Sequence, residues 1–99
     1  MPTFVLMTKL APEVSREVRH REELGQQWKA AVEEKCPDVR WISHFALLGP
    51  YDFMDIFEAK SEESAAKVSM ISRARGAVTA ESWTAIPYAR FLDINEEIA

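Results

Sequence analysis

A four-residue turn sequence near the middle of the chain, Gly49-Pro50-Tyr51-Asp52, leaves few topologies open. Glycine relaxes the backbone, proline fixes one dihedral angle and aspartate hydrogen-bonds nearby amides, so this combination is typical of a tight turn. Residues 39–48 and 53–59 on either side are rich in aromatic and aliphatic residues, as β-strands are. The sequence therefore predicts a central β-hairpin whose two turn residues are Pro50 and Tyr51.

On the N-terminal side of the hairpin, the sequence predicts a strand and then a helix. Residues 3–8 are β-rich, with apolar residues at both odd and even positions, as in a strand that is buried on both faces. Apolar residues then recur at helical spacing from Pro12 to about Cys36, with an interruption near Arg21. Because Pro37 cannot continue a helix, the first helix is expected to end at about Cys36.

On the C-terminal side, a second helix and a last strand are predicted. Ser61 is a favourable N-cap, and Gly76 supplies the C-terminal stop of the helix. Residues 77–86 then form a strand that ends at Pro87, and residues 88–99 are expected to be a tail or a short helix.

The order strand, helix, strand, strand, helix, strand is typical of the ferredoxin-like βαββαβ arrangement, an α+β fold. Right-handed crossovers place both helices on one face of a four-stranded antiparallel sheet and leave the other face uncovered. The 99 residues are expected to form one domain.

The predicted turn also sets the pairing of the hairpin, with Leu48 opposite Phe53 and Ala46 opposite Asp55. The two faces that result are Ile42, His44, Ala46, Leu48, Phe53, Asp55 and Phe57 on one side and Trp41, Phe45, Leu47, Met54 and Ile56 on the other. We assign the second face to the helices because it is the more apolar, although a slip of one residue would exchange the faces. The first face is too apolar for water, so a homodimer with its sheets packed as a barrel is predicted.

Charge and composition exclude several classes of partner. The formal net charge is −4, and basic residues alternate with acidic ones, so no nucleic-acid surface is expected. No apolar run is long enough to span a membrane. A single cysteine, Cys36, and the lack of a signal-peptide pattern predict a cytoplasmic protein.

Two segments resemble the GYD domain family. The first is Phe4-Val5-Leu6-Met7-Thr8-Lys9-Leu10-Ala11-Pro12-Glu13, and the second is the Gly-x-Tyr-Asp hairpin Leu47-Leu48-Gly49-Pro50-Tyr51-Asp52-Phe53. The chain departs from the family pattern at Val14 and at Cys36-Pro37-Asp38. The resemblance implies a dimeric α+β barrel, a fold shared with effector-binding domains of leucine-responsive regulators and with cofactor-free monooxygenases. It supplies no established substrate and implies no cofactor.

His44 and Asp55 are the candidate catalytic residues. In the predicted register they are diagonal neighbours on the partly apolar face, where an aspartate beside a histidine can make a general base. The alternative is a satisfied structural pair, because no nucleophile or phosphate loop accompanies it. Two ligands fall short of the usual three or four, so no metal site is predicted.

Aromatic residues near this pair are candidates for binding a ligand. Tyr51 at the hairpin tip offers a hydroxyl and a ring, while Phe53, Phe57 and Trp83 could line an aromatic pocket. Trp83 belongs to that pocket only if its face of the last strand is the one covered by the partner. Gly49, Tyr51 and Asp52 otherwise serve the turn itself.

Two functions follow from these observations. The leading hypothesis is a homodimeric module that binds a small apolar or aromatic ligand or mediates assembly. The alternative is an enzyme similar to cofactor-independent monooxygenases, in which His44 removes a proton from a desolvated substrate. Sensing by a transcription factor is disfavoured by the acidic charge.

Overall fold

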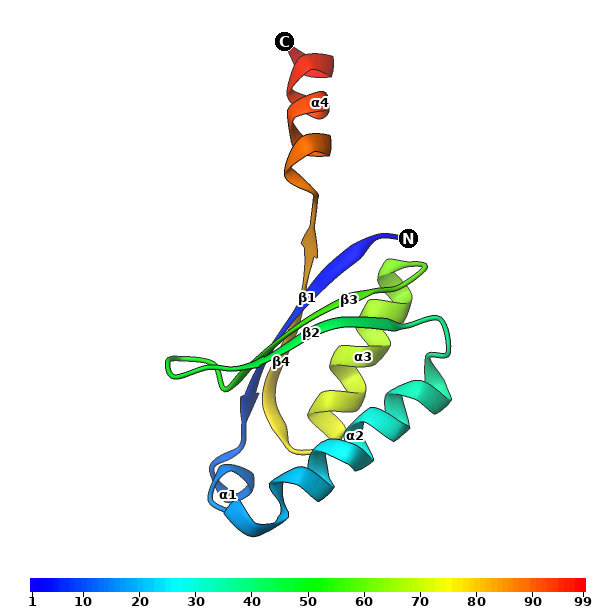
Figure 1. Cartoon of the computed structure of the whole chain (residues 1–99). Helices are drawn as coiled ribbons and strands as arrows, with labels where there is room; N and C mark the ends of the chain where they lie inside the picture. The colour runs from blue at the N-terminus through cyan, green and yellow to red at the C-terminus, as the bar shows by residue number, and fades with distance from the viewer.

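A four-stranded antiparallel sheet forms the centre of the molecule, and the computed structural model describes all 99 residues (Figure 1). The strands lie in the order β2-β3-β1-β4, which confirms the predicted ferredoxin-like α+β class. The elements in chain order are β1 (Thr3–Leu10), α1 (Pro12–Ser15), the 3-10 helix η1 (Val18–His20), α2 (Arg21–Lys35), β2 (Arg40–Ala46), β3 (Phe53–Glu58), α3 (Glu62–Ala74), β4 (Ala77–Ala85) and α4 (Tyr88–Ile98).

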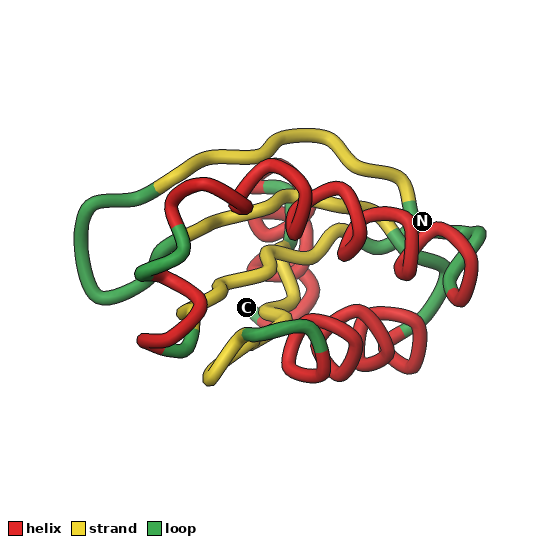
Figure 2. Tube along the Cα trace, turned by 90° about the horizontal axis from the view of Figure 1, so that it is seen from below, coloured by secondary structure: helices red, strands yellow, loops and turns green.

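The two long helices α2 and α3 line the same face of the twisted sheet (Figures 1 and 2). Fully buried side chains between the helices and the sheet include Leu6, Phe57, Val32 and Val68. Each such side chain contributes about 1.5–3 kcal/mol to stability by leaving water. None of the helices has the length and apolar character needed to cross a lipid bilayer.

The boundaries of α3 are as predicted. The Ser61 hydroxyl accepts a hydrogen bond from the Ser64 amide at 3.2 Å and thereby caps the helix. Gly76 has φ of 112°, a conformation that other residues rarely adopt, and it lets the chain turn directly into β4. Glycine is also needed there for space, because a Cβ on Gly76 would lie 3.0 Å from the Val14 side chain.

The single first helix predicted from Pro12 to Cys36 is wrong in its N-terminal part. The chain forms the short α1 and η1 before α2, because Glu17 leaves helical geometry with φ of −81° and ψ of 76°. The Ala11 amide donates to the Gly76 carbonyl at 2.9 Å, so α1 is fixed to the end of α3. The interruption visible in the sequence near Arg21 is therefore a real break between short helical pieces.

The hairpin turn is longer than predicted. The last paired residues are Ala46 and Phe53, and the Leu47 amide donates to the Asp52 carbonyl at 2.8 Å. His44 therefore lies directly opposite Asp55, two residues away from the predicted pairing. Leu48 does not oppose Phe53 and is fully exposed. A shift of two residues keeps each side chain on its face, because strand side chains alternate with a period of two.

The assignment of the two faces was the reverse of what the structure shows. β1 pairs Phe4 with Phe57 and Leu6 with Asp55, and all four side chains are buried on the helix side. The opposite surface, here called the open face, carries Val5, Met7, Phe45, Met54, Ile56 and Trp83. The sequence could not separate the faces because β1 is apolar at both odd and even positions.

The pairing of β2 with β3 shifts between Trp41 and Ser43. This shift places the Trp41 side chain on the helix side of the sheet. Trp41 pairs with Phe57 and joins the helix side, where its ring lies 5.5 Å from Phe57 and 5.1 Å from Trp28. Ile42 within the shift is half exposed. Trp28 and Trp41 thus form an aromatic contact between α2 and the sheet.

The loop of residues 47–52 is fixed to β1 by Asp52. Its carboxylate accepts a hydrogen bond from the Leu10 amide at 2.7 Å, and its own amide donates to the Thr8 carbonyl at 2.8 Å. The Lys9 ammonium also donates to the Pro50 carbonyl at 3.2 Å. Asp52 therefore joins the hairpin to the central strand in addition to shaping the turn.

We expect Asp52→Ala to lower the free energy of unfolding by about 1–2 kcal/mol, because the Leu10 amide loses its acceptor. Asp52→Asn keeps a side-chain carbonyl oxygen at the same place and should lose less. Urea unfolding of both variants measures the difference. Equal midpoints for the alanine variant and the unchanged protein would show that the contact does not stabilise the loop.

Candidate functional site

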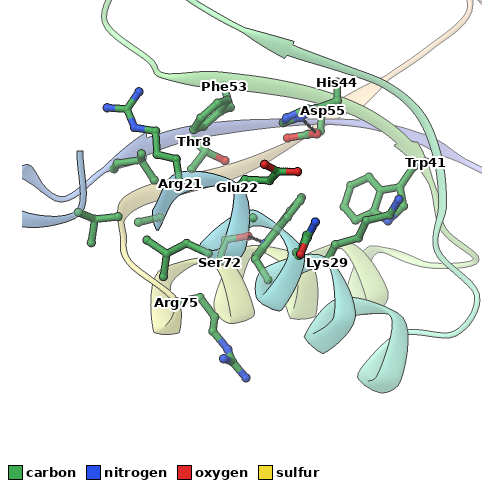
Figure 3. A pocket seen from close by; sticks show the side chains of 17 residues that line it. Thr8, Arg21, Glu22, Lys29, Trp41, His44, Phe53, Asp55, Ser72 and Arg75 are labelled. Atoms are coloured by element: carbon green, nitrogen blue, oxygen red, sulfur yellow. Dashed lines mark hydrogen bonds and ion pairs between the residues drawn. The ribbon is translucent and has the colours of Figure 1, made fainter. Parts of the chain in front are cut away.

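A cavity of about 530 Å³ lies between α2 and the helix-side face of the sheet (Figure 3). α2 packs mainly on α3, and Val32 is its only buried residue, so its N-terminal half stands off the sheet. Thr8, Phe53 and Asp55 come from the sheet, and Trp28 and Gly25 come from α2. The volume is within the range of about 300–1,000 Å³ that is common for small-molecule sites.

Asp55 and His44 form a hydrogen-bonded pair at the sheet side of this cavity. They occupy facing positions of β3 and β2, and the His44 Nδ1 contacts the Asp55 carboxylate. Figure 3 shows the two side chains turned toward each other. Asp55 is 3% exposed, whereas the His44 side chain is 62% exposed because β2 is an edge strand. The predicted candidate pair is therefore in direct contact.

Burial raises the pKa of Asp55 above its ordinary value, because the ionised form loses hydration. The adjacent His44 opposes this shift by its charge and its hydrogen bond, but desolvation is the larger effect. The cavity thus contains a carboxyl group that holds its proton more tightly than an exposed aspartate does.

The rim of the cavity on α2 carries both signs of charge. Arg21, Glu22 and Lys29 line it, and the Arg21 guanidinium donates to the Ser15 carbonyl. Figure 3 shows the Glu22 carboxylate directed toward the side where Asp55 lies, while the Arg75 guanidinium points away. The surroundings of the cavity are therefore polar, although its walls are largely aromatic and aliphatic.

One wall residue has an unpaired polar group. The indole N–H of Trp41 is buried and has no hydrogen-bond acceptor within the chain. An unpaired buried donor costs about 1–3 kcal/mol. Because this N–H is enclosed by protein atoms, it is not available to a molecule in the cavity.

The predicted ligand-binding residues do not share one cavity. Phe53 lines the cavity with His44 and Asp55, but Phe57 is completely buried in the core. Trp83 pairs with Val5 and lies on the open face. The condition under which Trp83 would join His44 and Phe57 is therefore not met, because the sheet separates them.

Tyr51 also belongs to the open face. Its hydroxyl donates to Glu81 at 3.1 Å, and the Trp83 indole N–H donates to the other oxygen of Glu81 at 2.8 Å. The two rings meet edge to face at 6.1 Å. The hydrogen bond to Glu81 raises the pKa of Tyr51. Asp52 and Tyr51 of the signature thus contact β1 and β4, and none of Gly49, Tyr51 and Asp52 lines the cavity.

Sequence reasoning missed the helical wall of the cavity. Gly25 lies in the middle of α2, and a Cβ placed there would meet nothing within 4 Å. A glycine inside a helix is unfavourable by about 1 kcal/mol relative to alanine, and this unusual position was the available signal. Trp28, which packs on Trp41, lines the cavity as well.

The fold and the cavity define a ferredoxin-like α+β domain with a space between its helices and its sheet. The sequence matches the GYD domain family over residues 4–94, and the chain belongs to this family. The resemblance seen in the two sequence segments is thereby confirmed.

Two further comparisons agree with this placement. A Thermus thermophilus protein named glutamine synthetase and cystathionine beta-lyase binding protein is 29% identical over 89 residues, which cover 90% of this chain and 93% of that protein. The crystal structure of FFRP-DM1 has a TM-score of 0.56 at 16% identity and covers 87% of this chain and 100% of that one. The second likeness concerns the fold alone.

The raised pKa of Asp55 predicts a pH-dependent stability. The folded state binds more protons than the unfolded state between the ordinary aspartate pKa of about 3.9 and the raised value, so the contribution of Asp55 falls as pH rises through this range. Asp55→Asn cannot titrate and still offers an oxygen to His44. The free energy of unfolding of Asp55→Asn minus that of the unchanged protein should therefore increase with pH and then level off.

Urea unfolding at several pH values between 4 and 8 measures this difference. Asp93→Asn, a change of the same kind at an exposed position of α4, is the control for the loss of one carboxylate from the chain. A difference between Asp55→Asn and the unchanged protein that is constant or shrinks with pH would contradict the assignment.

Proposed function

We propose that the chain is a homodimeric module that binds a small, largely apolar ligand in the cavity between α2 and the sheet. The observation that carries this proposal is the cavity itself, in which Trp28, Trp41 and Phe53 lie beside polar side chains of the sheet and of α2. Apolar walls supply affinity through burial, and a small number of polar groups fix the orientation of the ligand.

The polar groups limit the chemistry of the ligand. Protonated Asp55 can donate a hydrogen bond to a ligand, and ionised Asp55 can accept one. At the rim on α2, the two cations Arg21 and Lys29 outnumber the one anion, Glu22, which favours a negative group on the exposed end of the ligand. We therefore propose an aromatic or aliphatic body with one hydrogen-bonding group inside and an anionic group at the rim.

A catalytic role is the second candidate, and the contact between His44 and Asp55 favours it. A carboxylate bonded to Nδ1 holds the imidazole ring in the orientation that a general base requires. The large exposure of His44 argues for binding over catalysis, because a base that acts on a desolvated substrate must itself be shielded from water.

The name of the Thermus relative supports a role in binding or assembly. That protein is named for binding two enzymes, and we propose that this chain likewise associates with a protein partner. A ligand in the cavity and a protein on the surface are compatible, because the cavity occupies only the helix side of the sheet.

Gly25 provides a direct test of the cavity. Gly25→Phe places a ring where a Cβ has open space, so it should fill part of the cavity and leave the fold intact. Gly25→Ala is the matched control and should raise the free energy of unfolding by about 1 kcal/mol through helix propensity. The probe is 8-anilino-1-naphthalenesulfonate, which combines aromatic rings with an anionic group.

Fluorescence titration should show one tight site per chain in the unchanged protein and in Gly25→Ala, and at least tenfold weaker binding in Gly25→Phe. Circular dichroism checks that both variants are folded. Equal affinity in a folded Gly25→Phe variant, or no saturable binding by the unchanged protein, would overturn the cavity as the site.

The homodimer is proposed to form through the open face. Phe45 and Trp83 are about half exposed there, beside the partly exposed Met54 and Ile56. An apolar sheet face of this kind needs a cover, and a second copy supplies a surface of the same shape by twofold symmetry. The apolar face first predicted to pair is the covered one, so the proposed contact uses the opposite side of the sheet.

Ile56→Glu should dissociate the dimer, because a charge would be buried at the centre of the contact. Val18→Glu introduces the same residue at an exposed apolar position of η1 and should leave the mass unchanged. Light scattering at micromolar concentration measures both. A monomeric mass for the unchanged protein would refute the homodimer.

A further inference from the structure

The C-terminal helix α4 stands apart from the rest of the chain. It follows β4 after only Ile86 and Pro87 and extends in the direction in which the strand leaves the sheet (Figure 1). None of its residues is buried, and its Tyr88 and Ile98 side chains are 72% and 78% exposed. The helix therefore packs on no surface of its own chain.

The side chains of α4 divide into two faces, with Asn95 as one polar residue on the apolar side. At about 100° per residue, the apolar residues occupy one side and the charged residues the other. The apolar stripe consists of Tyr88, Phe91, Leu92, Ile94 and Ile98, and the charged side consists of Arg90, Asp93, Glu96 and Glu97. Such a pattern is typical of a helix whose apolar stripe packs against another surface.

Length makes this packing necessary. α4 has 11 residues, whereas isolated helices shorter than about 12–15 residues are marginal in water. The single ion pair between Arg90 and Glu97 is exposed and adds little. α4 therefore needs a surface for its apolar stripe in order to persist as a helix.

The connection to β4 directs α4 away from its own sheet. Pro87 is extended, with φ of −53° and ψ of 137°, and its carbonyl accepts the first helical hydrogen bond from the Phe91 amide at 3.0 Å. To fold back over the open face of its own chain, α4 would need the chain to reverse direction within Ile86 and Pro87. The ring of Pro87 fixes its φ and so opposes such a reversal.

We propose that α4 is an exchanged arm, which packs its apolar stripe on the sheet edge that borders the open face of a second copy of this chain. This inference rests on the proposed homodimer. Because a twofold axis relates the copies, each chain would give one arm and receive one.

The area that a stable dimer needs supports a second copy of this chain as the surface on which α4 packs. Four strands about 4.8 Å apart and five residues of about 3.3 Å give a sheet footprint of roughly 300 Å². A standard interface buries about 800 Å² per partner. An 11-residue helix about 16 Å long and about 10 Å wide adds roughly 160 Å², and each chain takes part in two such contacts. Arm exchange thus roughly doubles the contact that the sheets alone provide.

The test compares two substitutions by glutamate that are two residues apart on the same helix. Phe91→Glu places a charge in the apolar stripe, whereas Ala89→Glu places the same charge on the polar side and leaves the Arg90 ion pair intact. Dilution series by analytical ultracentrifugation give the dimer dissociation constant. We expect Phe91→Glu to raise this constant at least 30-fold and Ala89→Glu to change it less than threefold.

Hydrogen exchange of residues 88–98 gives an independent reading. Their amides should be protected in the unchanged dimer and should exchange rapidly both in Phe91→Glu and in the monomer produced by Ile56→Glu. A dimer with unprotected α4 amides, and with equal effects of the two glutamate variants, would overturn the arm and leave the homodimer intact. A monomeric unchanged protein would overturn both.

Discussion

The burial of Asp55 on the helix side of the sheet determines the arrangement of most other residues in the site. A carboxyl group in this position requires a polar partner, and His44 on the neighbouring strand supplies it. Because strand side chains alternate, Phe53 and Phe57 must lie on the same side as Asp55, and Met54 and Ile56 must lie on the other. The register of β3 in the sheet thus determines both which residues line the cavity and which residues lie on the open face.

The Gly-Pro-Tyr-Asp sequence has an architectural role that its turn propensity alone does not reveal. Asp52 completes the hydrogen bonding at the end of β1, and Tyr51 reaches across to Glu81 on β4. These contacts connect the hairpin to the strands that follow β3 in the sheet order. A signature of this kind preserves the position of the hairpin relative to the open face, and the chemistry of the cavity depends on residues elsewhere.

The sequence was sufficient for the order of the elements because the signals involved are local. Ser61 and Gly76 mark the ends of α3, and the four-residue turn marks the hairpin. Register and face were not predictable, because they depend on a six-residue loop, on the shift at Ile42 and on a β1 strand that is apolar on both sides. His44 and Asp55 were identified as a pair, but the helical wall at Gly25 appears only when α2 is placed over the sheet.

The two proposed roles lie on opposite sides of one central strand. Consecutive residues of β1 alternate between them, with Leu6 and Thr8 toward the helices and Val5 and Met7 toward the open face. A substitution in β1 acts directly on the face to which its side chain points, but any shift of the strand backbone would reach both surfaces. Gly25 on α2 and Phe91 on α4 each border only one of the two surfaces. Energetic effects at such distant positions without shared contacts add, so occupancy of the cavity and exchange of the arm can be resolved independently.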